Sequence, residues 1–351
     1  MAVALKTARR DFLVGVGAAA MSGCTGIGSR PTVHSENRIR FSVFADIHYM
    51  PGVFPNDTPA HLDRVLARAH EAESDFIIHL GDFTHAPEKY SDYVRRYNDC
   101  GIPAYHVLGN HDTEQSRYEA VKDVYRMPDG HYFFDRGGFR FIVLDTNWAR
   151  IGGKWTHYHQ SNYTTVPFAQ AWRVPPFEQE WLKEVLAASP HPCVVFSHQS
   201  MERAVKGSPD GEAVRRIFNE ANARRPGRVR LVLNGHHHID NLRILDGIVY
   251  FDVNSANYKW YGQVCKKYPA DYLAKYKLAN MVIAWEDPLN AVITMGAGGE
   301  IEIEGMRSSF MHGVSPADAG LPVEFGGRAV TPAIQSASFC MKYGEWLEKQ
   351  S

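Results

Sequence analysis

Three consecutive histidines, His236, His237 and His238, follow Gly235 at the end of the apolar run 229–233. Neutral imidazole is the side chain that most often binds metals in proteins. In an extended segment alternate side chains point to the same side, so we expect His236 and His238 to face one pocket and His237 to turn away. A solvated histidine turn would have the same local sequence. The other ligands of a metal site must therefore come from elsewhere in the chain.

Short polar sequences follow four other apolar runs, and each contains residue types that bind metals. They contain Asp46 and His48 after the first run, Asp82 after the second, Asn110, His111 and Asp112 after the third, and His198 after the fourth. In α/β sheets, ligands bind at the carboxyl ends of the strands. One Asp-x-His or Gly-Asp sequence alone has little meaning, because such pairs are common in turns. Five polar sequences at five strand ends predict one common site.

The apolar runs read as strands of an α/β fold. Strands at 39–44, 75–80 and 102–108 alternate with helices at 59–74 and 88–99. Strands that are apolar throughout are typical of a sheet covered on both faces. The remaining expected elements are a hairpin at 131–135 and 139–144, helices at 176–188 and 211–223, strands at 193–196 and 229–233, and antiparallel strands at 242–245, 249–253, 281–284, 291–294 and 301–303.

In chain order the motifs are D-x-H, G-D, G-N-H-D, H and G-H-x-H, and this series resembles the calcineurin-like metallophosphoesterase family over residues 39–258. The resemblance implies a four-layer α/β/β/α sandwich with mixed sheets. It implies that one metal ion is held by Asp46, His48 and His238, a second by Asn110, His198 and His236, and both by a bridging Asp82. His111 matches the histidine that contacts the phosphate and protonates the leaving group. We expect Asp112 to orient His111.

Such a site suits phosphoester hydrolysis. Two cations about 3.5–4 Å apart stabilise the entering and leaving oxygens and lower the pKa of a bound water. Asp, Asn and His ligands accept manganese, iron, zinc or cobalt, so the metal stays open. Phe83 and Thr84 follow Asp82 where purple acid phosphatases carry a tyrosine ligand, which argues against a charge-transfer iron site.

Several other histidines and two asparagines lie outside the motifs. We expect His79, His106 and His131 to be structural, whereas for His85, His157 and His159 both a structural place and a contact with the substrate stay open. Asn254 and Asn257 follow a strand and lie near the site, without an assigned role. Residues 147–175 form an insert rich in aromatic rings, which either line the substrate pocket or form the small core of a lid.

The expected reaction is hydrolysis of a small phosphodiester or phosphomonoester. The formal net charge of −1 gives no basic field for a long nucleic acid. One alternative is a protein that binds phosphate or a nucleotide through its metals without turnover, and the intact His111 speaks against it. Another is a secreted scaffold with incidental histidines, which would bind no stoichiometric metal.

The first 23 residues resemble a twin-arginine export signal. Lys6, Arg9 and Arg10 precede the apolar run 12–21, which is too short to span a bilayer. Met21-Ser22-Gly23-Cys24 is similar to a lipoprotein cleavage box, so lipidation of Cys24 and simple cleavage are both open. We therefore expect a protein of the periplasm or cell envelope, with membrane attachment if Cys24 is lipidated.

The chain divides by composition into four parts. After the signal come a linker at 24–37, a metallophosphoesterase domain at 38–306 and a C-terminal tail at 307–351 for which the sequence predicts no structure. The other cysteines, Cys100, Cys193, Cys265 and Cys340, are far apart and form no zinc-ribbon pattern. The sequence predicts neither a disulfide pairing nor an oligomeric state.

Overall fold

The computed structural model describes residues 38–55, 59–203, 205–263, 265, 267–342 and 345–348. The described helices and strands belong to the second of two compact units of the chain, His34–Ser351. The signal, the linker and Cys24 lie outside the described residues, so export and lipidation stay predictions. Among the described helices, none has both the length and the apolar character that crossing a membrane requires.

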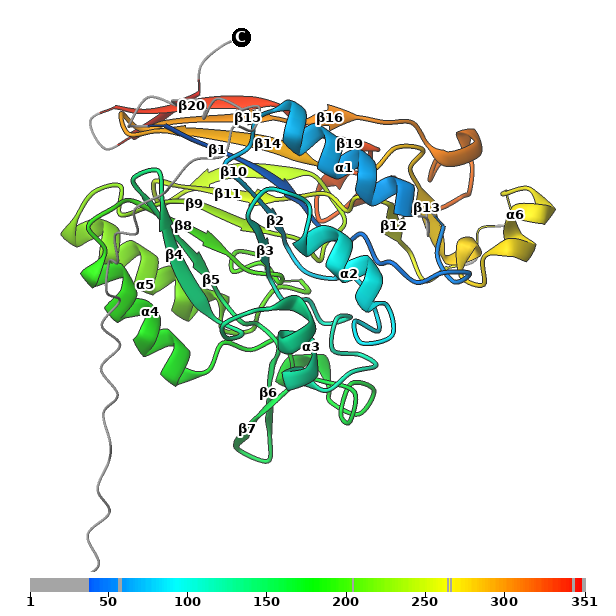
Figure 1. Cartoon of the computed structure of the whole chain (residues 1–351), viewed down its shortest axis with the longest axis horizontal. Helices are drawn as coiled ribbons and strands as arrows, with labels where there is room; N and C mark the ends of the chain where they lie inside the picture. The colour runs from blue at the N-terminus through cyan, green and yellow to red at the C-terminus, as the bar shows by residue number, and fades with distance from the viewer. Residues whose placement is uncertain are drawn as a thin grey trace, which may run out of the picture. The chain divides into compact units, whose positions relative to one another are not determined.

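Two mixed sheets form the centre of this unit (Figure 1). The first has the order β21-β20-β15-β14-β1-β2-β3, made of Glu345–Glu348, Ala337–Lys342, Glu300–Glu304, Ala291–Gly296, Arg38–Phe44, Phe76–His79 and Ala104–His106. The second has the order β10-β11-β9-β8-β5-β4, made of Asn241–Leu245, Ile248–Asp252, Val229–Asn234, Cys193–Phe196, Phe139–Val143 and Tyr132–Arg136.

Helices cover the outer face of each sheet. They are α1 (Pro59–Glu71), α2 (Ser91–Asn98) and α3 (Tyr118–Tyr125) on the first sheet, and α4 (Pro176–Ala188) and α5 (Gly211–Arg224) on the second. A short helix α6 (Ala270–Lys275) and 3-10 turns at Phe168–Gln170, Ala279–Met281 and Met311–Gly313 lie in the loops. The layers are therefore α/β/β/α, as the sequence predicted.

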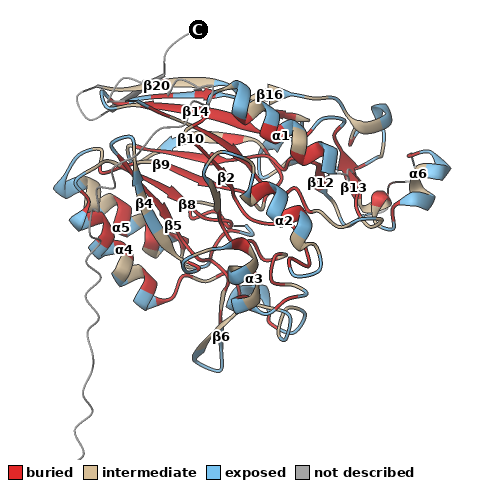
Figure 2. Cartoon of the chain, in the orientation of Figure 1, coloured by how far each residue is buried: buried red, intermediate tan, exposed pale blue. Residues whose placement is uncertain are grey.

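Alternation along the strands explains why their sequences are apolar throughout. In β2, Phe76 and Ile78 pack between the two sheets, whereas Ile77 packs beneath the helices of the first sheet. In β8, Phe196 faces the same inter-sheet core and Val195 faces α4 and α5. Figure 2 shows this burial along the central strands. Removing one such buried side chain typically costs about 2–5 kcal/mol of stability.

Parallel pairing brings the strand ends together. Strands β1, β2 and β3 run parallel to one another, and so do β5, β8 and β9. Parallel strands present their carboxyl ends at the same edge of a sheet. The loops after β1, β2, β3, β8 and β9, which carry the motif residues, therefore converge.

The structure adds elements that the sequence did not predict. Helix α3 buries two tyrosines and one valine, Tyr118, Tyr125 and Val121, so its inner face lacks the aliphatic periodicity of a typical core helix. The aromatic insert holds a hairpin of β6 (Trp148–Ile151) and β7 (Lys154–His157). Strand β12 (Tyr258–Trp260) is new and pairs with β13 (Val282–Ala284), the strand predicted at 281–284. Two further short pairs are β16 (Met306–Arg307) with β19 (Ala333–Ile334), and β17 (Glu324–Phe325) with β18 (Arg328–Ala329).

The C-terminal tail is part of the same unit. Strand β20 pairs with β15 and extends the first sheet past residue 306. The Asn254 side chain donates hydrogen bonds to the carbonyls of Thr331 and Ala333 at 2.9 and 3.0 Å, which holds the tail on the loop after β11. The tail thereby reaches the edge where the motifs gather.

Candidate metal centre and active site

The motif loops have unusual backbone conformations. Asp46, His48, Asp82, His236 and His238 have positive φ angles of 52°, 48°, 54°, 68° and 50°. Left-handed backbone is uncommon outside glycine, costs about 1–3 kcal/mol per residue and is concentrated at functional sites. The expectation of an extended His236–His238 segment was therefore wrong, because β9 ends at Asn234. The rings of His236 and His238 reach the same pocket because both residues have left-handed backbone conformations.

Two glycines allow the loops to approach each other. A Cβ on Gly235 would lie 2.6 Å from Oδ2 of Asp46, and a Cβ on Gly109 would lie 2.2 Å from Oδ1 of Asp82. Both distances are shorter than any tolerable contact. The two carboxylates can occupy their positions only because these residues have no side chain.

The first group of candidate ligands contains Asp46, His48 and His238, all buried. Nε2 of His238 lies 3.2 Å from Nε2 of His48 and 3.2 Å from Oδ1 of Asp46. Nε2 of His48 lies 3.8 Å from the same Oδ1. The three side chains thus point their donor atoms at one small volume, as the sequence predicted for one metal ion.

The second group contains Asp82, His198 and His236. Nε2 of His198 lies 3.1 Å from Oδ2 of Asp82 and 3.3 Å from Nδ1 of His236. The same Oδ2 lies 3.6 Å from Nε2 of His48 in the first group. Asp82 therefore faces both groups, which is the arrangement required of a bridging carboxylate.

Asn110 lines the same pocket as Asp82 and His236 of the second group. Its Oδ1 accepts a 3.0 Å hydrogen bond from Nε2 of Gln199, and its Nδ2 donates to the hydroxyl of Tyr163 at 3.1 Å. These partners fix the orientation of the amide. The oxygen retains a second lone pair that can bind a cation.

Hydrogen bonds to the histidines test whether the site fits metal ions. Nδ1 of His198 lies 2.7 Å from the carbonyl of Leu80, and Nδ1 of His238 lies 2.7 Å from the carbonyl of Tyr258. A carbonyl only accepts, so each Nδ1 carries a proton and each Nε2 of a neutral ring presents a lone pair. These lone pairs face carboxylates. The repulsion is relieved by a cation between them, so the donor set fits metal ions.

The charge on His198 supports the same conclusion. Burial disfavours the charged ring, but the carboxylates of Asp82 and then Asp46 raise the pKa of His198 to about 9. The centre therefore takes up positive charge as a proton when no metal ion supplies it.

His111 is held beside this centre. Its backbone N–H donates to Oδ1 of Asp82 at 2.7 Å, and its Nδ1 lies 2.8 Å from Oε2 of Glu114. Burial lowers the pKa of His111, but Asp82 and then Glu114 outweigh it, so the pKa is above its usual value. The hydroxyl of Tyr163 also lies 2.9 Å from Nδ1.

The role predicted for Asp112 was wrong. Its carboxylate accepts backbone hydrogen bonds from Asp82, Phe83, Thr84 and Gly109 at 2.8–3.1 Å and a 2.6 Å bond from the hydroxyl of Tyr125. These donors occupy the carboxylate, so Asp112 holds the loops after β2 and β3 together. Glu114 is the carboxylate that binds the His111 ring.

His85 joins both parts of the site. Its Nε2 lies 2.9 Å from Nδ1 of His48, and its Nδ1 lies 2.7 Å from Oε2 of Glu114. Since Glu114 accepts, Nδ1 of His85 donates to it and Nε2 accepts from His48. His48 then presents its other nitrogen, Nε2, to the metal position. His85 also lines the pocket, so it lies within reach of substrate.

Sequence reasoning did not find Glu114, Gln199 or Tyr163. Glu114 and Gln199 each lie within three residues of a predicted site residue, and this proximity was the available signal. Tyr163 lies in the aromatic insert, more than fifty residues from Asn110. Of the two readings left open for His157 and His159, the structure favours the structural one, because neither lines the pocket and His157 stacks on Tyr118 at 3.5 Å.

The residues expected to be structural are placed as such. The rings of His79 and His106 are buried and share a 2.6 Å hydrogen bond. The ring of His131 packs edge-on against Trp181 at 4.6 Å. Asn257 donates to the carbonyl of Ile47 and so supports the loop of the first ligand group.

The ligand groups lie in a cavity of about 700 Å³. Its apolar walls are formed by Tyr158, Tyr163, Val166, Pro167, Phe168 and Trp172 of the insert and by Met50, Val53, Phe54, Tyr258, Trp260 and Leu278 opposite them. The insert also packs a small core of its own around Tyr158 and Trp172. Both expectations for the insert are therefore met, and a substrate with an apolar or aromatic moiety would fit beside the metal groups.

The sequence and the fold of this chain are similar to those of known proteins. The family described as Calcineurin-like phosphoesterase matches residues 39–240. A dimetal phosphatase from Danio rerio has a similar structure, with a TM-score of 0.53, 14% identity and coverage of 76% of this chain and 95% of that one. A putative 5'-nucleotidase from Staphylococcus aureus has a TM-score of 0.43, 14% identity and coverage of 82% and 56%.

At 14% identity the likeness to the Danio rerio phosphatase establishes the fold. No curated protein sequence matches this chain. The match to the family covers more than half of the chain and includes all seven predicted ligands. The chain belongs to the calcineurin-like phosphoesterase family.

Proposed function

We propose that this protein hydrolyses the phosphoester bond of a small phosphodiester or phosphomonoester with two bound metal ions. The observation that carries the proposal is the shared carboxylate. Asp82 lies 3.1 Å from His198 in one ligand group and 3.6 Å from His48 in the other. His111, held by Glu114, lies beside both groups and lines the same cavity.

The metal ions would be held by Asp46, His48 and His238 on one side, by Asn110, His198 and His236 on the other, and by Asp82 between them. When bound, two such cations supply Lewis-acid stabilisation of the phosphoryl oxygens and an activated water. The identity of the metal stays open among manganese, iron, zinc and cobalt.

The protein's own contribution to the reaction is made by His111. Glu114 accepts the proton of Nδ1, so the ring keeps a fixed orientation and leaves Nε2 for the substrate. A protonated ring can donate from Nε2 to the leaving oxygen while its charge offsets that of the phosphoryl group. Burial lowers the pKa of His111, but Asp82 and then Glu114 raise it above its usual value, which favours the protonated ring.

The experiment measures turnover of p-nitrophenyl phosphate and bis(p-nitrophenyl) phosphate by full-length protein with added manganese or cobalt. We expect activity that EDTA abolishes and that His111→Ala lowers about 10²–10⁴-fold, the usual range for loss of a general acid. His70→Ala removes an exposed histidine and serves as control. Absence of turnover on both esters with every metal would contradict the proposal.

We also propose that the enzyme acts in the periplasm or cell envelope and that lipidation of Cys24 attaches it to a membrane. The support is the resemblance of residues 1–23 to an export signal. Arg9→Lys/Arg10→Lys should retain the precursor inside the cell, and Cys24→Ala should release the processed protein from the membrane fraction. Unchanged fractionation of both variants would contradict export by this route.

A further inference from the structure

One wall of the cavity carries positively charged side chains that the proposed phosphoester hydrolysis at the two ligand groups does not use. Lys206, His237, Lys259 and Phe325 line this wall. Nζ of Lys259 donates to the carbonyl of His237 at 2.7 Å and lies 3.8 Å from the centre of the Phe325 ring. Nζ of Lys206 lies 5.8 Å from the same ring. Two ammonium groups therefore meet at one aromatic side chain.

The two lysines have no anionic partner among the residues that the structure describes. In the part of the chain that the structure describes, neither Lys206 nor Lys259 forms an ion pair. The neighbouring Arg203 is different, because its guanidinium lies 3.3 Å from the carboxylate of Asp252. Lys259 is only 4% exposed, and burial together with Lys206 and Arg203 lowers its pKa to about 7. An anion bound between the two lysines would offset the unfavourable free energy of burying a charged Lys259 beside other cations.

The ring of His237 gives an independent indication. The side chain is 2% exposed, and neither ring nitrogen has a hydrogen-bond partner among the described residues. Leaving a buried polar group unpaired costs about 1–3 kcal/mol. In either neutral tautomer one nitrogen carries a proton that an anionic oxygen can accept. The sequence predicted that His237 turns away from the pocket, whereas it lines the pocket.

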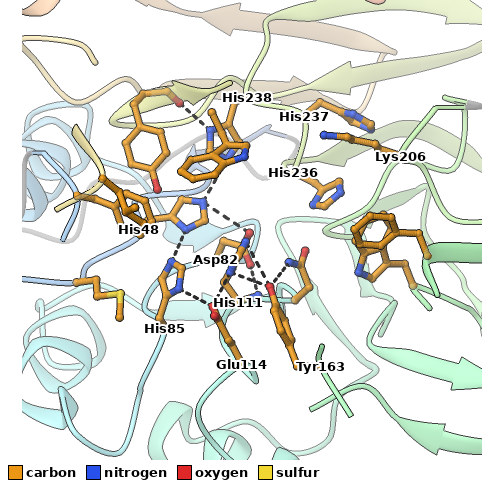
Figure 3. Close-up of a pocket in the computed structure, with 18 of the residues that line it drawn as sticks. His48, Asp82, His85, His111, Glu114, Tyr163, Lys206, His236, His237 and His238 are labelled. Carbon is orange, nitrogen blue, oxygen red and sulfur yellow. Dashed lines mark hydrogen bonds and ion pairs between the residues drawn. The ribbon is translucent and has the colours of Figure 1, made fainter. Parts of the chain in front are cut away.

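This wall is continuous with the metal groups. The ring centres of His236 and His237 are 5.5 Å apart, and both residues line the same cavity. Figure 3 shows Lys206 and His237 on the His236 side of the pocket, away from His85 and Glu114. A single substrate molecule can therefore reach both the two ligand groups and the lysines.

We propose that Lys206, His237 and Lys259 form a second anion site, which binds a phosphate or carboxylate group of the substrate. The proposal rests on the function proposed above and narrows it. The preferred substrates are phosphate esters whose alcohol part carries a second anionic group. Packing of Lys259 on Phe325 would also arise in a purely structural role, but it leaves the two nitrogens of His237 and the charge of Lys206 unexplained.

The first test compares propyl phosphate with 3-carboxypropyl phosphate and propane-1,3-diyl bisphosphate, each also as its p-nitrophenyl diester. We expect a kcat/KM at least ten-fold higher for a substrate with the second anionic group. Comparison of the carboxylate substrate with the bisphosphate shows which of the two anions the site prefers. Lys206→Met and Lys259→Met should each lower this ratio at least five-fold. Lys154→Met, at an exposed position of β7, is the matched control. Equal losses on all substrates would indicate a structural role and overturn the proposal.

The second test does not depend on turnover. Full-length protein in EDTA is titrated with sodium sulfate by calorimetry, so that metal-bound sulfate does not contribute. We expect one sulfate per chain and at least five-fold weaker binding in Lys206→Met and in His237→Phe. Sulfate binding without any phosphoesterase activity would contradict the proposed function and leave the anion site standing. No binding, or equal binding by wild type and variants, would overturn the anion site.

Discussion

Oε2 of Glu114 lies 2.8 Å from Nδ1 of His111, so this carboxylate fixes the orientation of the His111 ring. The same oxygen lies 2.7 Å from Nδ1 of His85. Burial opposes ionisation of Glu114, but hydrogen bonds from His111 and His85 lower its pKa to about 2. Glu114 is therefore an anion throughout the neutral range, and hydrogen bonds through His85 link it to His48, a proposed metal ligand.

Replacing Glu114 by glutamine should change the pH dependence of the reaction. Glu114 raises the pKa of His111, so Glu114→Gln should lower that pKa. A general acid must be protonated, and kcat falls as pH rises through its pKa. We therefore expect the alkaline limb of the kcat profile to move to lower pH, with kcat at pH 8 reduced about 10–100-fold.

The matched control for this prediction is Glu119→Gln, which removes an exposed carboxylate paired with Lys122 on α3. Its profile should coincide with that of the wild type. A uniform loss of activity in Glu114→Gln, with no displacement of the limb, would show that Glu114 acts on folding and not on the charge of His111.

Replacing Asp112 by asparagine should reduce stability. The carboxylate accepts hydrogen bonds from four backbone N–H groups and from Tyr125, and an amide of the same size cannot accept all of them. Each hydrogen bond to a charged group is worth about 1.5–3 kcal/mol. We expect urea unfolding to show a loss of about 2–4 kcal/mol. The exposed Asp123→Asn should differ from wild type by less than about 0.5 kcal/mol, and an equal effect of the two variants would contradict the assignment.

A buried carboxylate pair behind the site should make stability depend on pH. Burial and then Asp145 raise the pKa of Glu178 well above its usual value, and Oε2 of Glu178 has no hydrogen-bond partner in the described residues. The folded state thus binds this proton more tightly than the unfolded state. The proton stabilises the fold below the unfolded pKa of about 4.3, and this contribution is lost as pH rises.

Glu178→Gln removes this titration while keeping an oxygen for the N–H of Asp145, 2.8 Å away. We expect the variant to gain at least about 1 kcal/mol over wild type at pH 8 compared with pH 5, since one pKa unit corresponds to about 1.4 kcal/mol. Urea unfolding at both pH values checks this, with the exposed Glu180→Gln as control. If the stability difference between the variant and the wild type is the same at pH 5 and pH 8, Glu178 has the same protonation in the folded and unfolded states.

The sequence predicted that the candidate ligands meet because each is part of a short motif after an apolar strand. The apolar runs predicted parallel strands, whose carboxyl ends meet at one edge of a sheet. The sequence therefore predicted that the loops of Asp46, Asp82 and His198 lie close together, as they do in the structure. The direction of a side chain within a loop could not be predicted in the same way. His236 and His238 reach the pocket through left-handed backbone, and His237 lines the same pocket instead of turning away.

The sequence also could not predict which side chains form hydrogen bonds with each other, or which distant segments line the cavity. Asp112 follows His111 directly, so the sequence favoured it as the partner, but the loop turns its carboxylate toward backbone N–H groups. Phe325 reaches the cavity only because β20 joins the first sheet and Asn254 holds the tail. These contacts depend on the tertiary arrangement and have no local sequence signal.

The most direct test of the dinuclear centre is the metal content of wild type and Asp82→Ala after reconstitution with manganese and gel filtration. Asp82 faces both ligand groups, so its loss should disturb both. We predict two metal ions per wild-type chain, fewer than one in Asp82→Ala, and a fall in kcat/KM of at least about 10³-fold. Two bound ions and undiminished hydrolysis in Asp82→Ala would contradict the account.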